Sequence, residues 1–174
     1  GSYIAEALSE YGISSFIFVD NDILSTENIA RHYCGYEYVG KKKANALKDR
    51  LRKYNPNIMS DVYSENGLLF VENHETELNT CDLIFVATAN LPLEHRIVSE
   101  MCAGRITTPI ILVWVEPLLA AGHAILLNKP QNIFESLFEK EYTFKERVIT
   151  NGESFQKREC GCQSTYIPYG AFDL

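Results

Sequence analysis

The chain has 174 residues, 46% of them hydrophobic and 22% charged, which is enough for one domain with a buried core. Its net charge of -7 and its pI of about 5.1 argue against nonspecific nucleic-acid binding, which needs clustered lysine and arginine. No apolar run approaches the roughly 18 residues that span a membrane, and the five cysteines are odd in number and scattered. We therefore expect a cytoplasmic protein without membrane or nucleic-acid partners, and with at least some free thiols.

The first part of the chain alternates helical and extended patterns. Apolar residues recur at helical spacing over 3–11, and Gly12 is a natural C-terminal stop. The run SSFIFVD at 14–20 is rich in aromatic and β-branched residues, which predicts a strand that is buried on both faces and therefore parallel to its neighbours. A second helix is predicted over 40–56, and a strand within 57–66.

The second part continues the same alternation. Four elements are predicted: a strand at 81–90, a helix at 93–105, and strands at 109–116 and 120–128. Strands that alternate with helices predict an α/β fold of the Rossmann-like, doubly wound type with a mostly parallel sheet. Residues 129–158 are polar and aromatic without a clean period, and we expect a long loop excursion there, within a single domain of residues 1–174.

The start of the chain is unusual for this fold, because only Gly1 and Ser2 precede the first predicted helix. A doubly wound sheet normally begins with a central strand and a glycine-rich turn. Either Gly1 is the last glycine of such a turn, or Gly1 and Ser2 remain from expression. We favour the first explanation, so that the chain is a fragment without the first strand and the glycine-rich loop.

A nucleotide site would use Gly1 and Asp20. A helix N-terminus that follows a glycine turn binds phosphate through its free N–H groups and its partial positive charge. An acidic residue at the end of the next strand, about 20 residues further on, hydrogen-bonds a ribose hydroxyl. Asp20 ends the predicted strand and lies 19 positions after Gly1. The alternative is that Asp20 only caps the following loop.

The residues that follow Asp20 carry a more specific pattern. Three short motifs occur in order: Asp20-Asn21-Asp22, Asn28-Ile29-Ala30-Arg31 and Gly40-Lys41-Lys42-Lys43. Their order and spacing resemble the ThiF/MoeB/HesA superfamily, the activating enzymes of ubiquitin-like proteins and sulfur carriers. The NIARH form, and the stretch WVEPLLAAGHA at 114–124, look most like the bacterial conjugation-type branch of that superfamily.

The resemblance implies a role for each motif residue. Asp20 would hold the ribose of ATP, Asn28 and Arg31 would reach the phosphates, and Lys43 would place a positive charge on the phosphates and on the developing pyrophosphate. Asp22 would orient Arg31 or assist Mg²⁺, or else simply cap the loop.

Three neighbouring side chains are expected to be structural. Lys41 and Lys42 are expected on a solvated face, and His32 as a packed loop residue rather than a catalyst.

One position departs from the family pattern. Where the family often has an aspartate for Mg²⁺, this chain has Thr88-Ala89-Asn90. Alanine cannot bind a metal ion, and a neutral amide is a weaker Mg²⁺ ligand than a carboxylate. Either Asn90 and water suffice, or Asp22 compensates, or the activity is reduced.

The resemblance also implies a nucleophilic cysteine on a crossover segment within 129–174. Cys160 and Cys162 lie there in a polar, glycine-flanked stretch, and we expect Cys162 to attack the acyl-adenylate, with Cys160 as the second choice. One or both could instead be structural. A zinc site needs two Cys-x-x-Cys pairs, so the single Cys-x-Cys predicts no bound zinc. The other cysteines are expected to be small buried hydrophobes: Cys34, Cys81 and Cys102.

Trp114, Glu116 and His123 lie at the ends of two successive predicted strands. Glu116 and His123 could pair with each other or contact an incoming peptide. We favour a structural role for these polar groups at a dimer or loop contact.

Together the motifs and the resemblance imply an enzyme that uses ATP and Mg²⁺ to adenylate the C-terminal carboxylate of a ubiquitin-like or sulfur-carrier protein. Transfer of the acyl group to a cysteine would follow, and the family resemblance implies a homodimer. Two alternatives stay open: a degenerate scaffold subunit, favoured by Ala89, and a nicotinamide-dependent Rossmann oxidoreductase.

Overall fold

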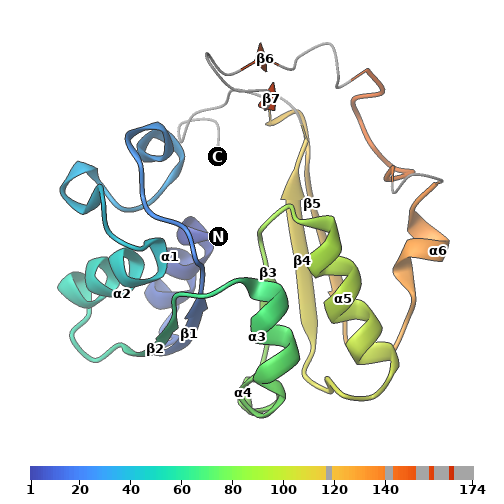
Figure 1. Ribbon diagram of the computed structural model, residues 1–174, viewed down its shortest axis with the longest axis horizontal. Coiled ribbons are helices and arrows are strands. Elements are labelled where there is room, and N and C mark those ends of the chain that lie inside the picture. The colour runs from blue at the N-terminus through green and yellow to red at the C-terminus, as the bar shows by residue number, and fades with distance from the viewer. Residues whose placement is uncertain (117–118, 140–142, 152–156, 159–164, 167–174) are drawn as a thin grey trace. The chain divides into compact units, whose positions relative to one another are not determined.

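The computed structural model describes residues 1–116, 119–139 and 143–151, together with the backbone of 157–158 and 165–166 (Figure 1). The chain divides into two compact units, a first unit of Gly1–His74 and a second unit of Glu75–Leu174. Each unit is considered by itself below.

The first unit contains a pair of parallel strands with helices around it. Its elements in chain order are α1 (Ser2–Glu10), β1 (Ser15–Val19), the 3-10 helices η1 (Thr26–Arg31) and η2 (Tyr36–Tyr38), α2 (Lys43–Tyr54), β2 (Met59–Tyr63) and α3 (Gly67–Asn73). β1 pairs with β2 in parallel, from Ser15 opposite Met59 to Val19 opposite Tyr63. Helix α2 connects these two strands and contacts both of them as well as α1. This strand–helix–strand unit brings the end of β1 and the start of α2 to one edge, as expected for parallel strands joined by a helix.

The first helix ends at Glu10, two residues before the glycine that the sequence predicts as its stop. Gly12 has a φ of +95°, a conformation that strains residues with a side chain. The amide of Gly12 donates to the carbonyl of Ser9, and the amide of Ile13 donates to the carbonyl of Leu8. These two bonds satisfy the last helical carbonyls and turn the chain into β1.

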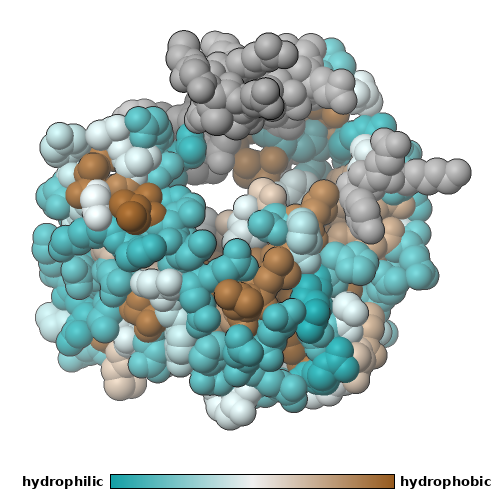
Figure 2. Space-filling model, in the orientation of Figure 1, coloured by the Kyte–Doolittle hydropathy of each residue, from teal (hydrophilic) through white to brown (hydrophobic). Residues whose placement is uncertain are grey.

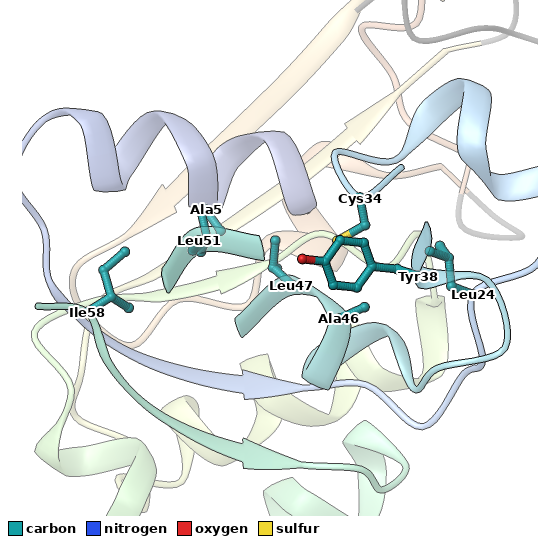
Figure 3. Close-up of a cluster of buried hydrophobic side chains, with 8 residues drawn as sticks. All are labelled: Ala5, Leu24, Cys34, Tyr38, Ala46, Leu47, Leu51 and Ile58. Atoms are coloured by element: carbon teal, nitrogen blue, oxygen red, sulfur yellow. The ribbon is translucent and has the colours of Figure 1, made fainter. Parts of the chain in front are cut away.

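A hydrophobic cluster fills the space between α1, α2 and the loop after β1 (Figure 3). Its buried members are Ala5, Leu24, Cys34, Tyr38, Ala46, Leu47, Leu51 and Ile58. Leu24 and Cys34 come from the long connection between β1 and α2 and have no exposed surface. The connection is therefore anchored by burial, which fixes the polar residues that precede and follow these anchors.

The second unit holds a three-stranded sheet with α5 in one of its connections. Its elements are α4 (Glu75–Thr80), β3 (Ile84–Val86), α5 (Leu91–Cys102), β4 (Ile110–Val115), β5 (Gly122–Leu127), α6 (Ile133–Leu137), β6 (Lys157–Arg158) and β7 (Thr165–Tyr166). β3 pairs with β4 in parallel, β4 with β5 antiparallel, and β6 with β7 antiparallel.

The predicted α/β fold of Rossmann type is confirmed, with three corrections of detail. The expected loop at 129–158 contains α6, whose Ile133 and Phe134 are buried, because five residues are too few to show a helical period in the sequence. Cys102 is exposed rather than buried, since it ends α5. The helices α3 and α4 were not expected.

No helix among the described residues is long and apolar enough to cross a membrane. The face of the molecule in Figure 2 is largely hydrophilic, with small hydrophobic patches between the polar residues.

Candidate functional site

The carboxylate of Asp20 lies directly after β1, at the edge of the first unit where β1 and β2 end. The amide of Asp20 donates to the carbonyl of Tyr63 at 3.1 Å, which continues the parallel pairing and fixes the backbone of Asp20. Its Oδ1 accepts the amide of Asp22 at 2.8 Å. Burial raises the pKa of Asp20, and the Asp22 amide and the nearby Lys43 ammonium only partly offset that effect. One oxygen of a half-buried carboxylate is thus held by its own loop, and the other can accept from a ligand.

Lys43 is the first residue of α2 and reaches back to the loop after β1. Its Nζ forms an ion pair with Oδ2 of Asp22 at 2.8 Å, with the Lys43 side chain 19% exposed and the Asp22 side chain 62% exposed. The backbone amide of Lys43 also donates to the carbonyl of Asp22 at 2.9 Å. Asp22 therefore fixes both the backbone and the ammonium of Lys43. The Lys43 ammonium lies close enough to the Asp20 carboxylate for the two charges to interact.

The stretch before α2 is joined to the stretch after β1 by further bonds. The carbonyl of Leu24 accepts the amide of Gly40 at 2.9 Å, and the amide of Leu24 donates to the carbonyl of Lys41 at 2.8 Å. Lys42 is half-buried, and its Nζ donates to the carbonyl of Asn21 at 2.6 Å in an exposed contact. Lys41 follows the expectation, in an exposed pair with Asp49 at 3.4 Å.

Asn28 and Arg31 lie on η1, which the sequence did not predict as a helix. Ser25 precedes η1, and its amide and hydroxyl donate to Oδ1 of Asn28 at 3.2 and 3.3 Å. This reciprocal cap uses the oxygen of Asn28 and leaves its NH₂ group as the donor for a ligand. Arg31 is exposed at the last position of η1.

His32 has the structural role that the sequence predicts. Its Nδ1 accepts the amide of Cys34 at 3.1 Å. Burial and the charge of Lys43 lower the pKa of His32 from 6.5 to about 4. The ring is therefore neutral at pH 7, as an accepting Nδ1 requires. Burial also raises the pKa of Cys34 to about 12, which keeps this thiol protonated.

Gly1 lies at the same edge of the first unit, since its amino group is close enough to Asp20 for their charges to interact. Gly1 also caps the start of α1, where its carbonyl accepts the amide of Ala5 at 3.2 Å. The other predicted site residues lie elsewhere. Asn90 belongs to the second unit, where its Oδ1 caps α5 by accepting the amide of Leu93 at 3.1 Å. Cys160 and Cys162 lie outside the described residues.

The structure also places two acidic side chains that the motif analysis did not single out. Glu94 and Glu100 face inward on α5 and are each 5% exposed. Burial raises the pKa of Glu94, whereas Glu100 pairs with Arg96 and Arg105. Neither position could be recognised from the sequence as buried, because glutamate is usually exposed.

The parallel strand pairs, the helical connection and the acidic residue at the end of β1 define a Rossmann-type α/β protein. The family model described as ThiF family matches residues 1–167, and the chain belongs to that family. The resemblance inferred from the motifs is therefore confirmed.

Individual relatives agree with this assignment. The chain is 26% identical over 176 residues to the "ATP-dependent ubiquitin transferase-like protein Cap2" of Pseudomonas aeruginosa, a match that covers 98% of this chain and 31% of the relative. The chain thus spans about a third of the length of that curated relative.

Solved structures share the fold. The crystal structure of PaaA matches with a TM-score of 0.55 and 25% identity, over 68% of this chain and 38% of PaaA. E. coli MccB with ATP matches with a TM-score of 0.54 and 23% identity, over 68% of this chain and 35% of MccB. E. coli TcdA in complex with AMP matches with a TM-score of 0.56 and 22% identity, over 64% of this chain and 45% of TcdA.

Proposed function

We propose that the chain is an adenylation domain that uses ATP and Mg²⁺ to activate the C-terminal carboxylate of a ubiquitin-like or sulfur-carrier protein. The observation that carries the proposal is the pair of opposite groups at one edge of the first unit: the Asp20 carboxylate, and the Lys43 ammonium held by Asp22. A carboxylate suits ribose hydroxyls, and an ammonium suits phosphates. Family membership, the name of the Pseudomonas relative and the nucleotides bound to MccB and TcdA support the same chemistry.

In this proposal Asp20 accepts from the ribose, and Lys43, Arg31 and the NH₂ group of Asn28 bind the phosphates. A carboxylate oxygen of the partner protein attacks the α-phosphorus. The new O–P bond forms as the bond to the leaving pyrophosphate breaks, and pyrophosphate departs with the electron pair. Lys43 and Arg31 stabilise the charge that develops on it.

The described residues could hold Mg²⁺ only together with the phosphates of ATP. Among 1–116, 119–139 and 143–151, no three His, Cys, Asp or Glu side chains lie close enough to hold a metal ion. Mg²⁺ commonly binds through one or two carboxylates, substrate phosphates and water. Asp22, exposed beside Lys43, is the carboxylate that would hold it, since the oxygen of Asn90 caps a helix. When bound, the ion neutralises phosphate charge.

A thiol step follows adenylation in this proposal. The thiolate of Cys162, with Cys160 as the alternative, attacks the acyl carbon of the adenylate. A C–S bond forms, the C–O bond to AMP breaks, and AMP leaves with the electron pair. The thiol proton passes to water. We also propose a homodimer, which sedimentation of the purified protein tests.

ATP–pyrophosphate exchange tests the adenylation. It is measured with the chain, alone and within its complete open reading frame, and with ubiquitin-like proteins encoded beside it. We expect exchange that Arg31→Ala abolishes and Cys162→Ala preserves. The control is Arg52→Ala, which removes an exposed arginine from the last turn of α2 and should leave exchange unchanged. Exchange that survives Arg31→Ala would contradict the assigned role of Arg31.

A catalytically degenerate scaffold is the second candidate, and Ala89 favours it. Ala89 has a φ of +48°, a region that Asp and Asn enter more readily than Ala. Ala89→Asp is therefore compatible with the backbone, and a large gain of exchange in this variant would indicate a decayed site. The nicotinamide alternative is tested by binding: tight binding of NADH without binding of ATP would replace the adenylation proposal.

A further inference from the structure

Arg50 lies on α2 with its guanidinium over two tyrosine rings of the first unit. Its Cζ is 5.1 Å from the ring centroid of Tyr33 and 4.8 Å from that of Tyr54. The two ring centroids are 6.3 Å apart. A cation within about 6 Å of an aromatic ring centre is attracted by the negative face of the ring. Arg50 therefore joins Tyr33, in the connection between β1 and α2, to Tyr54 at the end of its own helix.

The polar contacts of Arg50 are weaker than its ring contacts. Its side chain is 25% exposed, and its Nη1 lies 3.7 Å from Oε1 of Glu37, a side chain that is 52% exposed. Solvent screens such an ion pair. Nε of Arg50 is buried and has no hydrogen-bond partner in the part of the chain that the structure describes. The two rings are therefore the main attachment of Arg50 to the connection between β1 and α2.

Tyr33 also contacts the first helix. Its amide donates to Oγ of Ser2 at 3.0 Å, and Ser2 is a buried residue at the start of α1. The ring of Tyr33 meets the ring of Tyr3 edge-on, with centroids 6.1 Å apart. Tyr33 is thus the point at which one connection is held to α1 by its backbone and to α2 by its side chain.

The residue held in this way is close in sequence to the phosphate-binding candidate Arg31. Arg31 is exposed at the last position of η1, and only His32 separates it from Tyr33. The turn after η1 is closed by a long bond of 3.4 Å from the amide of His32 to the carbonyl of Ile29. The place of Arg31 relative to α2, which begins at Lys43, therefore depends on what holds Tyr33.

We propose that Arg50 is a positioning residue for Arg31, because Arg50 holds the Tyr33 ring and thereby fixes the end of η1 against α2. The inference rests on the proposed function, since it concerns the phosphate contact of Arg31. Arg50 lies about two helical turns after Lys43 and is assigned no contact with the nucleotide itself. A guanidinium that is held near its bound position before the ligand arrives loses less conformational freedom on binding.

Arg50→Met is the first test, measured with the complete open reading frame that contains the chain. Methionine keeps a long side chain for contact with the rings but removes the cation. We expect the hydrogen-exchange protection of the Tyr33 amide, measured by NMR, to fall about fivefold or more. The Kd for ATP, measured by calorimetry, should rise about five- to tenfold. Unchanged protection of Tyr33, or unchanged ATP affinity despite lost protection, would refute the inference.

Arg52→Met is the matched control. It removes the same charge from the same helix, and Arg52 is exposed in the last turn of α2. The protection of the Tyr33 amide and the Kd for ATP should both stay within about twofold of wild type. An equal loss of ATP affinity in both methionine variants would mean that the overall positive charge of α2 attracts ATP, and would overturn the inference.

A double-mutant cycle with Arg31→Ala separates positioning from a general loss of stability. If Arg50 acts through Arg31, Arg50→Met should change the Kd for ATP less than about twofold once Arg31 is alanine. Losses that multiply in the double variant would show that Arg50 acts independently of Arg31. Undiminished ATP binding in Arg31→Ala alone would also overturn the inference, because Arg50 would then have no phosphate contact to position.

Tyr33→Phe and Tyr33→Leu test the ring from the other side. Phenylalanine keeps the ring face for Arg50 and should leave ATP affinity within about twofold of wild type, whereas leucine should reproduce the loss seen in Arg50→Met. Equal ATP affinity of the two variants would refute the role of the ring. A wild type that does not bind ATP would refute the proposed function and the positioning of Arg31 together. In that case the protection of the Tyr33 amide in Arg50→Met would still decide whether Arg50 holds the connection.

Discussion

Asp20→Asn is the sharpest test of the proposed nucleotide site, because the loop after β1 engages only one of the two carboxylate oxygens. Oδ1 of Asp20 already accepts the Asp22 amide at 2.8 Å, and asparagine can keep that bond with its own oxygen. The second oxygen becomes an NH₂ group, which cannot accept from a ribose hydroxyl. The loop after β1 should therefore stay in place while the acceptor for the ligand is lost.

The expected loss follows from one charge-assisted hydrogen bond. Such bonds contribute about 1.5–3 kcal/mol. Asp20 is half-buried, so we expect the lower part of that range, about 1.5–2 kcal/mol, which corresponds to a roughly ten- to thirtyfold weaker Kd for ATP. Because burial raises the pKa of Asp20, ATP affinity in the wild type should begin to fall with decreasing pH earlier than for an ordinary aspartate, and Asp20→Asn should lack that dependence.

Titration calorimetry with ATP, 2′-deoxy-ATP and 3′-deoxy-ATP measures this effect. In the wild type, removal of the hydroxyl that Asp20 binds should cost affinity, and in Asp20→Asn that penalty should largely disappear. Asp61→Asn is the control, since Asp61 is an exposed aspartate on the neighbouring strand β2. If Asp20→Asn weakens all three nucleotides equally and keeps the deoxy penalty, Asp20 does not bind the ribose.

Three further predictions concern the same unit. Lys43→Met should weaken ATP binding roughly ten- to hundredfold in calorimetry by removing a charged phosphate contact, and undiminished affinity would exclude Lys43 from the site. Without Mg²⁺, Asp22→Asn should leave ATP affinity unchanged or raise it, because a negative charge is removed. With Mg²⁺, the same substitution should lower ATP affinity. A change of ATP affinity in the same direction under both conditions would contradict the assigned metal role. The pKa of His32 is lowered to about 4, so the unfolded state gains its proton first and stability should fall as pH drops from about 6.5 to 4. After a discount for the partial exposure of His32, the expected fall in unfolding free energy is about 1–2 kcal/mol, measured by urea unfolding. An equal fall in His32→Gln would show that His32 is not its cause.

The sequence was sufficient for the regular elements because their signals are local. Gly12 lies two residues after the last residue of α1, Asn55 follows the last residue of α2, and the apolar run at 14–20 is β1. Periodicity and helix stops require only neighbouring residues, so a single chain can be interpreted at these positions. The five-residue helix α6 was missed because it is too short for a period.

The contacts within the site were less predictable, because they depend on how distant segments meet. The motifs identified Asp22 and Lys43 as site residues but proposed Arg31 or Mg²⁺ as the partner of Asp22. The ion pair with Lys43 arises because burial of Leu24 brings the stretch after β1 against the stretch before α2. The half-buried Lys42 has the same cause, since only the folded loop places its ammonium against a carbonyl. Oε1 of Glu116 pairs with Nε2 of His123 at 2.7 Å, which was one of the alternatives considered, but no pattern indicated that the amides of Val148 and Ile149 would also donate to Glu116.

The pair of Asp22 and Lys43 is suited to a site that must release and rebind its charges. A 62% exposed carboxylate and a 19% exposed ammonium form a pair that contributes only about 0–1 kcal/mol, because solvent screens it. Bringing polyanionic phosphate to Lys43 therefore costs little, whereas a fully buried pair would resist separation by several kcal/mol. The backbone bond between Lys43 and Asp22 does not depend on that charge pairing. The start of α2 can thus stay fixed while the ammonium exchanges one anionic partner for another, which is what repeated binding of ATP and release of pyrophosphate would require.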